Sequence, residues 1–211
     1  MGGGEDTMRR TLRSLMVLLA AFVTLGGAQS AQAQDTASTP KIEIFGGYSY
    51  MNANIVVSGT RFNLNGASGS VAYNVNNWLG VVGDFGVYGQ GNVAANGRSL
   101  TVSSYQFGPR ISWRGHALVP FGQVLLGGGH ATGTLYTTSL GNGAAPLGAN
   151  NGFMLTAGGG VDWKMNHTIG IRLVQTEYLY STFLNAAGSP GKNHQNNVRI
   201  SAGVVLSFGK R

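Results

Sequence analysis

The residues able to carry out acid-base or nucleophilic chemistry are few in this chain. The sequence has four histidines, seven acidic residues and no cysteine among 211 residues. A nucleophilic serine needs a base beside it and a third group that orients the base. His130 and His194 lie in polar segments with no serine and acidic residue aligned beside them, and His116 and His167 lie in short polar segments. We therefore expect no catalytic site and no enzyme activity.

Metal, disulfide and phosphate chemistry are not indicated either. The absence of cysteine excludes disulfides and thiolate ligands, and the histidines and acids are too dispersed for a ligand set. The glycine runs 127–129 and 158–160 neither precede a predicted helix nor supply the Lys-Ser or Lys-Thr pair of a phosphate loop. We interpret these glycines as sites of bulges, tight curvature or close packing, and we expect no cofactor and no metal ion.

The N-terminal 33 residues are predicted to be an export signal. The segment Arg9–Arg13 is basic, Leu15–Leu25 is apolar, and Ala31–Ala33 has the small-x-small pattern of a cleavage site. The apolar core is too short to span the ~30 Å of a bilayer's hydrocarbon. We predict cleavage after Ala33, with Met8 as an alternative true start, because acidic residues are unusual in a positive n-region.

Charge and composition exclude several classes of protein. Without residues 1–33 the chain has 11 basic and 5 acidic residues, so its net charge is 11 − 5 = +6. These charges are scattered singly, whereas nucleic-acid binding needs clustered basic residues, so we expect no nucleic-acid partner. Charged residues make up only 10% and hydrophobic residues 43% of the chain, which argues against disorder.

Alternation with a period of two is the main pattern after the signal segment. Between Val198 and Phe208 the even positions are apolar, while most odd positions are small or polar. Such alternation is typical of a strand with two different faces. Related patterns, some of them noisier, predict eight strands, at 42–50, 64–76, 79–88, 100–113, 117–131, 152–163, 168–182 and 198–208.

The seventh predicted strand breaks its own parity. Arg172 is at an even position, but Gln175 and Glu177 are at odd positions. Keeping all three side chains on one face requires one extra residue, so we predict a β-bulge near residues 173–175.

The connections between the predicted strands alternate in length. Short turns fall at 76–77, 114–116 and 165–167, and longer Gly/Asn/Ala/Ser segments at 51–61, 89–99, 132–151 and 184–196. An antiparallel meander with short turns at one end and long loops at the other is typical of outer-membrane barrels, which close because lipid cannot satisfy open backbone groups. We predict an all-β fold, an eight-stranded antiparallel up-and-down transmembrane β-barrel over residues 41–211, after a periplasmic lead at 34–40.

Aromatic residues fall near both ends of this meander, where they can form girdles at the two membrane interfaces. The predicted short-turn girdle is Trp78, Trp113, Trp163 and Phe208, and the predicted long-loop girdle is Tyr48, Tyr50, Tyr88, Tyr178 and Tyr180.

Charges on the minor face of the strands are predicted to point into the barrel. They are Glu43, Asp84, Arg110, Asp162, Arg172, Glu177 and Arg199. Two interpretations remain open: an ion-pair gate across a narrow pore, or a static polar plug. We favour the plug, because the interior of an eight-stranded barrel is filled by side chains.

Five segments resemble those of small OmpA-like outer-membrane β-barrel proteins (outer membrane protein beta-barrel domain). They are Phe107–Arg110, Pro120–Gly128, Gly159–Trp163, Ile171–Tyr178 and Asn197–Gly203. The resemblance covers residues 41–208 and implies long loops outside the cell and short turns with both termini in the periplasm. Family barrels end on an aromatic residue read by the barrel-assembly machinery, whereas here Phe208 is followed by Gly209-Lys210-Arg211.

These patterns and the resemblance predict a bacterial outer-membrane protein with a structural or interaction role in the cell envelope, porin-like in fold but with at most a narrow pore. Its expected partners are outer-membrane lipids and, during biogenesis, the barrel-assembly machinery, and we expect a monomer. The sequence names no surface ligand. The alternative is a small lipid A-modifying enzyme, a deacylase or acyltransferase. The His-x-Ser spacing of such enzymes is absent here.

Overall fold

Eight antiparallel strands form one closed barrel in the computed structural model of the chain. The structure describes residues 39–53, 61–93, 98–115, 117–133, 149–183 and 194–210. The strands are β1 (Pro40–Ala53), β2 (Phe62–Asn74), β3 (Leu79–Val93), β4 (Arg98–Ser112), β5 (Leu118–Thr132), β6 (Ala149–Lys164), β7 (Ile169–Ser181) and β8 (Gln195–Lys210). The predicted fold class is therefore confirmed.

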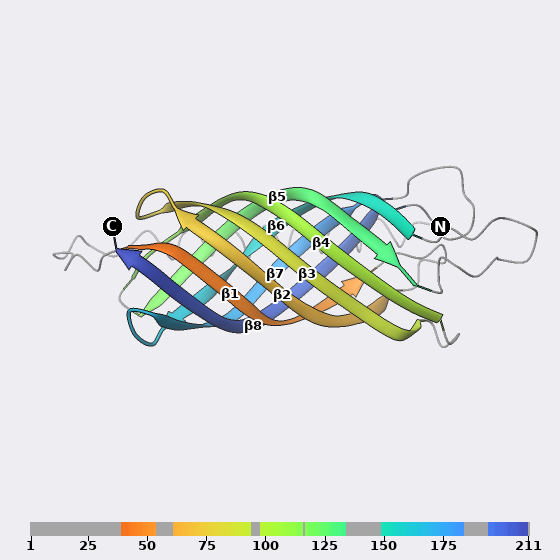
Figure 1. Cartoon of the computed structure of the whole chain (residues 1–211), viewed down its shortest axis with the longest axis horizontal. Helices are drawn as coiled ribbons and strands as arrows, with labels where there is room; N and C mark the ends of the chain where they lie inside the picture. Colours follow the sequence, from red (N-terminus) through yellow and green to blue (C-terminus); the bar gives the residue numbers. More distant parts are fainter. Residues whose placement is uncertain are drawn as a thin grey trace, which may run out of the picture. The chain divides into compact units, whose positions relative to one another are not determined.

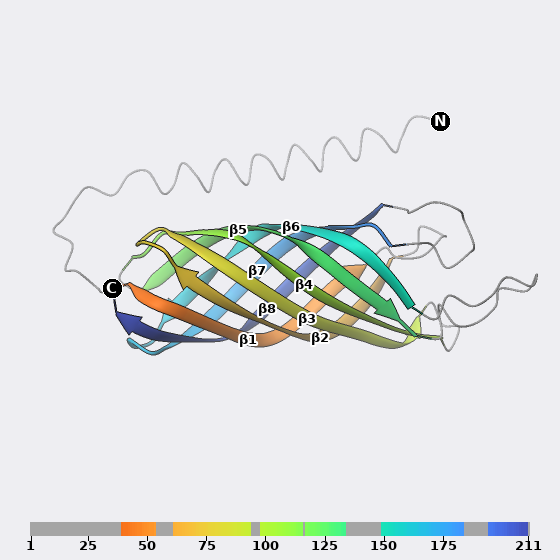
Figure 2. The same ribbon diagram turned by 45° about the horizontal axis from the view of Figure 1, so that its top comes forward.

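Each strand pairs with its neighbour in sequence, and β1 pairs with β8 to close the ring (Figure 1 and Figure 2). The closing register runs from Pro40 opposite Lys210 to Asn52 opposite Val198. No edge strand is left, so the backbone groups of every strand have partners on both sides. The described residues contain no helix that is long and apolar enough to cross a membrane. The predicted signal segment, residues 1–33, lies outside the described residues.

The short turns after β2 and β6 have the same construction. The Oδ1 atom of Asn76 accepts hydrogen bonds from the backbone N–H groups of Trp78 and Leu79, at 2.9 and 2.7 Å. Asn166 accepts from Thr168 and Ile169 in the same way, both at 2.8 Å. A side chain that satisfies two backbone donors stabilises a tight turn and explains asparagine at these positions.

Several strands extend further toward the long-loop end than predicted. β1 continues to Ala53, β3 to Val93, and β8 starts at Gln195. The predicted limits were wrong there because the outward side chains, such as Asn52 and Asn196, are polar and give no apolar alternation. The ladder of backbone hydrogen bonds continues regardless of that pattern. Apart from Arg61, Gly133 and His194, the remaining parts of the four predicted loops lie outside the described residues, and β1 begins at Pro40, inside the predicted lead.

The predicted β-bulge in β7 is confirmed. The register against β8 shifts between Arg172 and Gln175, and the register against β6 shifts at the same height. Leu173 and Val174 are consecutive residues, yet both point outward, with 49% and 42% of their surface exposed. The extra residue returns Gln175 and Glu177 to the face that carries Arg172, as the parity of the sequence required.

The outward face of the barrel is apolar. Its exposed side chains come from all eight strands and include Ile44, Val71, Phe85, Phe107, Leu126, Phe153, Leu173 and Val204. Seven charged side chains, by contrast, are buried in the interior. This is the reverse of the arrangement in a water-soluble protein, where charged residues are almost never fully buried.

Candidate functional site

The interior of the barrel contains all seven charged residues that the alternation assigned to it. Each is at most 8% exposed. They come from six strands: Glu43 (β1), Asp84 (β3), Arg110 (β4), Asp162 (β6), Arg172 and Glu177 (β7), and Arg199 (β8).

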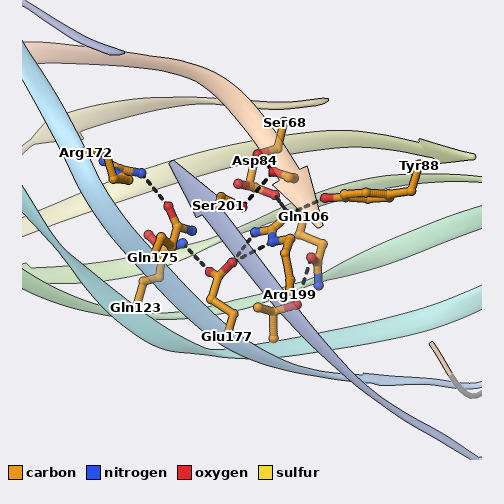
Figure 3. Close-up of polar contacts among 12 residues, drawn as sticks. Ser68, Asp84, Tyr88, Gln106, Gln123, Arg172, Gln175, Glu177, Arg199 and Ser201 are labelled. Carbon is orange, nitrogen blue, oxygen red and sulfur yellow. Dashed lines mark hydrogen bonds and ion pairs between the residues drawn. The ribbon is translucent and has the colours of Figure 1, made fainter. Parts of the chain in front are cut away.

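Arg199 is the centre of the largest cluster, which Figure 3 shows. Its Nε donates to Glu177 Oε2 at 2.6 Å, and its Nη1 donates to Asp84 Oδ1 at 2.8 Å. The same nitrogen also donates to the hydroxyl of Tyr88 at 2.8 Å. Arg199 is 0% exposed, so these contacts replace the water that its guanidinium loses on burial.

Gln123 joins this cluster to the next arginine. Its side-chain amide donates to Glu177 Oε1 at 2.8 Å, and its carbonyl accepts from Arg110 Nε at 3.0 Å. One neutral side chain thereby links a carboxylate and a guanidinium that belong to different ion pairs.

Arg172 forms a second cluster. Its guanidinium donates to both carboxylate oxygens of Asp162, at 2.7 and 3.0 Å, and to Gln175 at 2.6 Å. The guanidinium also lies over two aromatic rings, 4.2 Å from the centroid of Phe45 and 4.4 Å from that of Phe121. A bidentate pair between aromatic faces holds the arginine in one orientation.

At the short-turn mouth of the lumen lies an ion pair that the sequence analysis missed. Arg114 donates to Glu43 at 2.8 Å, and Arg110 approaches the same carboxylate at 4.0 Å. Adding Arg114 gives four arginines and four acids in the interior ion pairs. Its even position, two residues after the inward Ser112, was the signal that could have identified it.

Tyr88 was wrongly assigned to the long-loop girdle. It is 0% exposed and points inward, where it accepts the hydrogen bond from Arg199. Its ring lies against Gly86, where any Cβ would collide with it. Tyr88 shares even parity with Asp84, so the alternation already placed it on the inner face and its aromatic character misled the assignment.

The other girdle residues point outward. Trp78, Trp113, Trp163 and Phe208 are 55%, 59%, 43% and 44% exposed, near the short turns. On the long-loop half, Tyr48 and Tyr178 donate to Asn65 and Asn196, both at 2.5 Å, and Tyr50 and Tyr180 are half-buried. Contact of these aromatics with a membrane interface stays a prediction.

The long-loop half of the lumen is largely apolar, with Ser181, Gln195 and Asn197 as buried polar exceptions, which corrects the expectation of an interior filled by polar and charged side chains. We call this cluster the apolar cap. It consists of Met51, Ala53, Leu64, Tyr88, Leu100, Val102, Ala131, Met154, Leu179 and Phe183, each at most 1% exposed. The prediction failed because Met51 and Ala53 fell in a predicted loop, and because the inner faces of the strands were searched for charges, so that inward apolar residues such as Val102 and Met154 went unnoticed.

His130 and His194 have neutral partners. His130 Nδ1 hydrogen-bonds to Asn151 at 2.6 Å, and His194 stacks on Tyr180 and shares a hydrogen bond with its hydroxyl. Within the described ranges there is no group of three or more histidine and acidic side chains suited to holding a metal ion. The strongest chemical feature of the site is thus its ion-pair network.

Comparison with solved structures shows which barrels this one resembles. Neisserial surface protein A matches with a TM-score of 0.56 and 17% identity over 80% of this chain and 97% of its own. Ail, the attachment invasion locus protein of Yersinia pestis, matches with a TM-score of 0.52 and 18% identity over 79% of this chain and 99% of its own. The fold is that of small bacterial outer-membrane barrels. No family model matches the sequence, and no curated protein matches it significantly.

Proposed function

We propose that this protein is a bacterial outer-membrane barrel with a structural or interaction role. The observation that carries the proposal is the inversion of the two faces: apolar side chains cover the outside while four ion pairs with well-formed contacts lie inside. Lipid stabilises the first face, and only a closed barrel stabilises the second. Outer-membrane lipids are the partner of the apolar face, and the barrel-assembly machinery is the partner during insertion.

The lumen is proposed to be a static plug with no ion-conducting path. Arg199, Glu177 and Asp84 fill the central section, and the apolar cap fills the section next to the long loops. Moving a buried arginine away from its partners leaves uncompensated charge in a low-dielectric space, which costs roughly 3–5 kcal/mol. Spontaneous opening of the network is therefore rare.

The interaction role is proposed for the long-loop end of the barrel. On β1 and β2 the outward side chains there change from apolar to polar, with Asn52, Asn63 and Asn65 in place of Ile42, Ile44 and Val71 nearer the short turns. Polar outward residues mark a strand section that stands clear of the hydrocarbon layer and presents its end to the surroundings. We propose a monomer for this arrangement.

The proposal is tested by localisation and conductance together. The full-length chain, expressed in a Gram-negative bacterium, is expected in the outer-membrane fraction, with a compact form in gels that shifts on boiling. In planar bilayers the purified protein is expected to give no conductance above background. Recovery in the soluble fraction would contradict the location, and regular conductance steps would contradict the plug.

A separate assay addresses catalysis. Purified folded protein incubated with lipid A is expected to leave its acyl chains unchanged, as followed by mass spectrometry. The support for this expectation is that, among the residues that the structure describes, His130 hydrogen-bonds to Asn151 and His194 to Tyr180, and neither partner is a serine or an acid. Loss or gain of an acyl chain would replace the proposed role with an enzymatic one.

A further inference from the structure

Phe183 lies beyond the last residue pair of the β7–β8 ladder, yet it is completely buried. β7 ends at Ser181 opposite Gln195, and Phe183 follows two residues later with 0% of its surface exposed. A residue at the outer end of a barrel strand normally faces solvent, since loops run over the surface. Here the ring instead joins the apolar cap.

Two glycines make room for the ring. A Cβ on Gly129 of β5 would come within 2.8 Å of the Phe183 ring, and a Cβ on Gly152 of β6 within 2.9 Å. Both distances are shorter than real Cβ contacts, and the same Cβ atoms would also meet Met154 Sδ at 2.5 Å and the Thr182 carbonyl oxygen at 2.7 Å, so a larger residue at either position would displace the ring or its neighbours. We call this space the Phe183 socket.

The backbone of Phe183 is held in place by a buried side chain. Gln195 accepts from the Phe183 N–H at 2.9 Å and donates to the Phe183 carbonyl at 3.0 Å. The preceding residue, Thr182, is bonded to Phe153 of β6 through both its N–H and its hydroxyl. Gln195 is only 2% exposed, and burying an amide is favourable only when its hydrogen bonds are satisfied.

The apolar cap begins where the ion-pair network ends. Met51 pairs with Arg199 across the β1–β8 seam, and Leu64 pairs with Met51. From this height to the long-loop end the inward side chains are largely apolar, whereas toward the short turns they are largely polar down to Glu43 and Arg114. A ring of apolar side chains across a narrow lumen excludes water and closes it by dewetting.

We propose that Phe183 is a lid that closes the lumen against solutes from the long-loop side, and that Gln195 is the latch that holds it. The lid keeps the Arg199 network dry on that side, which strengthens its ion pairs because the local dielectric stays low. The two mouths of the lumen therefore differ: the short-turn mouth is polar, and the long-loop mouth is closed by the Phe183 lid and the apolar cap.

The absence of cysteine from the chain allows a direct test by thiol labelling. Ser104 is buried and points inward, two residues nearer the short turns than Val102 of the apolar cap. A cysteine at this position, in Ser104→Cys, therefore reports whether a reagent can pass the apolar cap from the long-loop side. In proteoliposomes of known orientation, a membrane-impermeant thiol reagent added on the long-loop side is expected to label S104C slowly. Adding Phe183→Ala is expected to raise the rate roughly tenfold or more, because labelling follows the population of the open state.

Matched variants separate the lid from a general loosening of the barrel. Val87→Ala removes an outward apolar side chain from the long-loop half of β3 and is expected to leave S104C labelling unchanged. Ser112→Cys, on the same strand and face near the short turns, is expected to react at the same rate with and without Phe183 when reagent is added on the short-turn side.

Two further variants keep the proposal testable if Phe183→Ala does not fold. Gln195→Ala removes the latch, and Gly152→Ala fills the socket; each is expected to raise S104C labelling from the long-loop side. Only variants that keep the boiling-dependent gel shift are compared. Fast labelling of S104C in the otherwise native chain would overturn the proposal. An unchanged labelling rate in every folded variant of Phe183, Gln195 and Gly152 would also overturn it.

Discussion

Arg114 and Glu43, separated by 71 residues in sequence, form a 2.8 Å ion pair at the short-turn mouth of the lumen. The side chains of both residues are only 9% exposed, so the pair is largely shielded from water. This contact gives every interior acid an arginine partner. It also ties the first strand of the barrel to the turn that follows the fourth.

Replacing Arg114 with Gln is expected to destabilise the folded barrel by roughly 1–3 kcal/mol, because Glu43 keeps only the distant Arg110 and loses its closest donor. Urea unfolding of the protein in lipid vesicles, followed by tryptophan fluorescence, measures the change. Arg61→Gln serves as the control, since Arg61 is exposed and bonds only to Asn52 among the contacts seen. Equal changes in the free energy of unfolding for the two substitutions would show that the Arg114–Glu43 pair stabilises the barrel no more than an exposed contact does.

Arg199→Met is expected to cost more, roughly 3–5 kcal/mol, since it leaves two buried carboxylates, Glu177 and Asp84, without their main partner. Neutralising those acids as well, in the triple variant with Glu177→Gln and Asp84→Asn, is expected to recover a substantial part of the loss. The same unfolding assay compares the two. If the triple variant is less stable than Arg199→Met, groups other than Arg199 must stabilise the charges of Glu177 and Asp84.

Deleting Val174 is expected to leave a barrel that folds. The deletion removes the extra residue of the bulge, so plain alternation keeps Arg172, Gln175 and Glu177 on the inner face. The control is deletion of Ile200 from β8, which has no bulge against β1 and would have to turn either Arg199 or Ser201 toward lipid, so it is expected to abolish the boiling-dependent gel shift. Loss of the gel shift in both deletion variants would contradict the assignment of Val174 as the extra residue.

The tryptophan emission of the protein reports on one end of the barrel, since the chain has only three tryptophans and all lie near short turns. In vesicles, brominated lipids with the bromine near the headgroup are expected to quench this emission more strongly than lipids brominated deep in the chain. Stronger quenching by the deep bromine would contradict the predicted interfacial position. Trp113→Phe should lower the signal without changing the order of the quenchers.

The sequence determined the class of fold and the direction of most side chains. Alternation with a period of two marks the faces of a strand, so it identified seven interior charges and even the extra residue at Leu173–Val174. Loop lengths that alternate between short and long then left an up-and-down meander, and lipid requires such a meander to close. These features are local, which is why one sequence sufficed for them.

Only the tertiary structure decided which interior groups meet. Period-two alternation gives the face of a residue but not its height in the barrel or its partner across the lumen. Arg199 reaches Asp84 over 115 positions of sequence and from a strand that is not its neighbour. The inward turn of Tyr88, the apolar cap and the buried ring of Phe183 likewise depend on how eight strands curve around one narrow space, because side chains from opposite walls must fill it together.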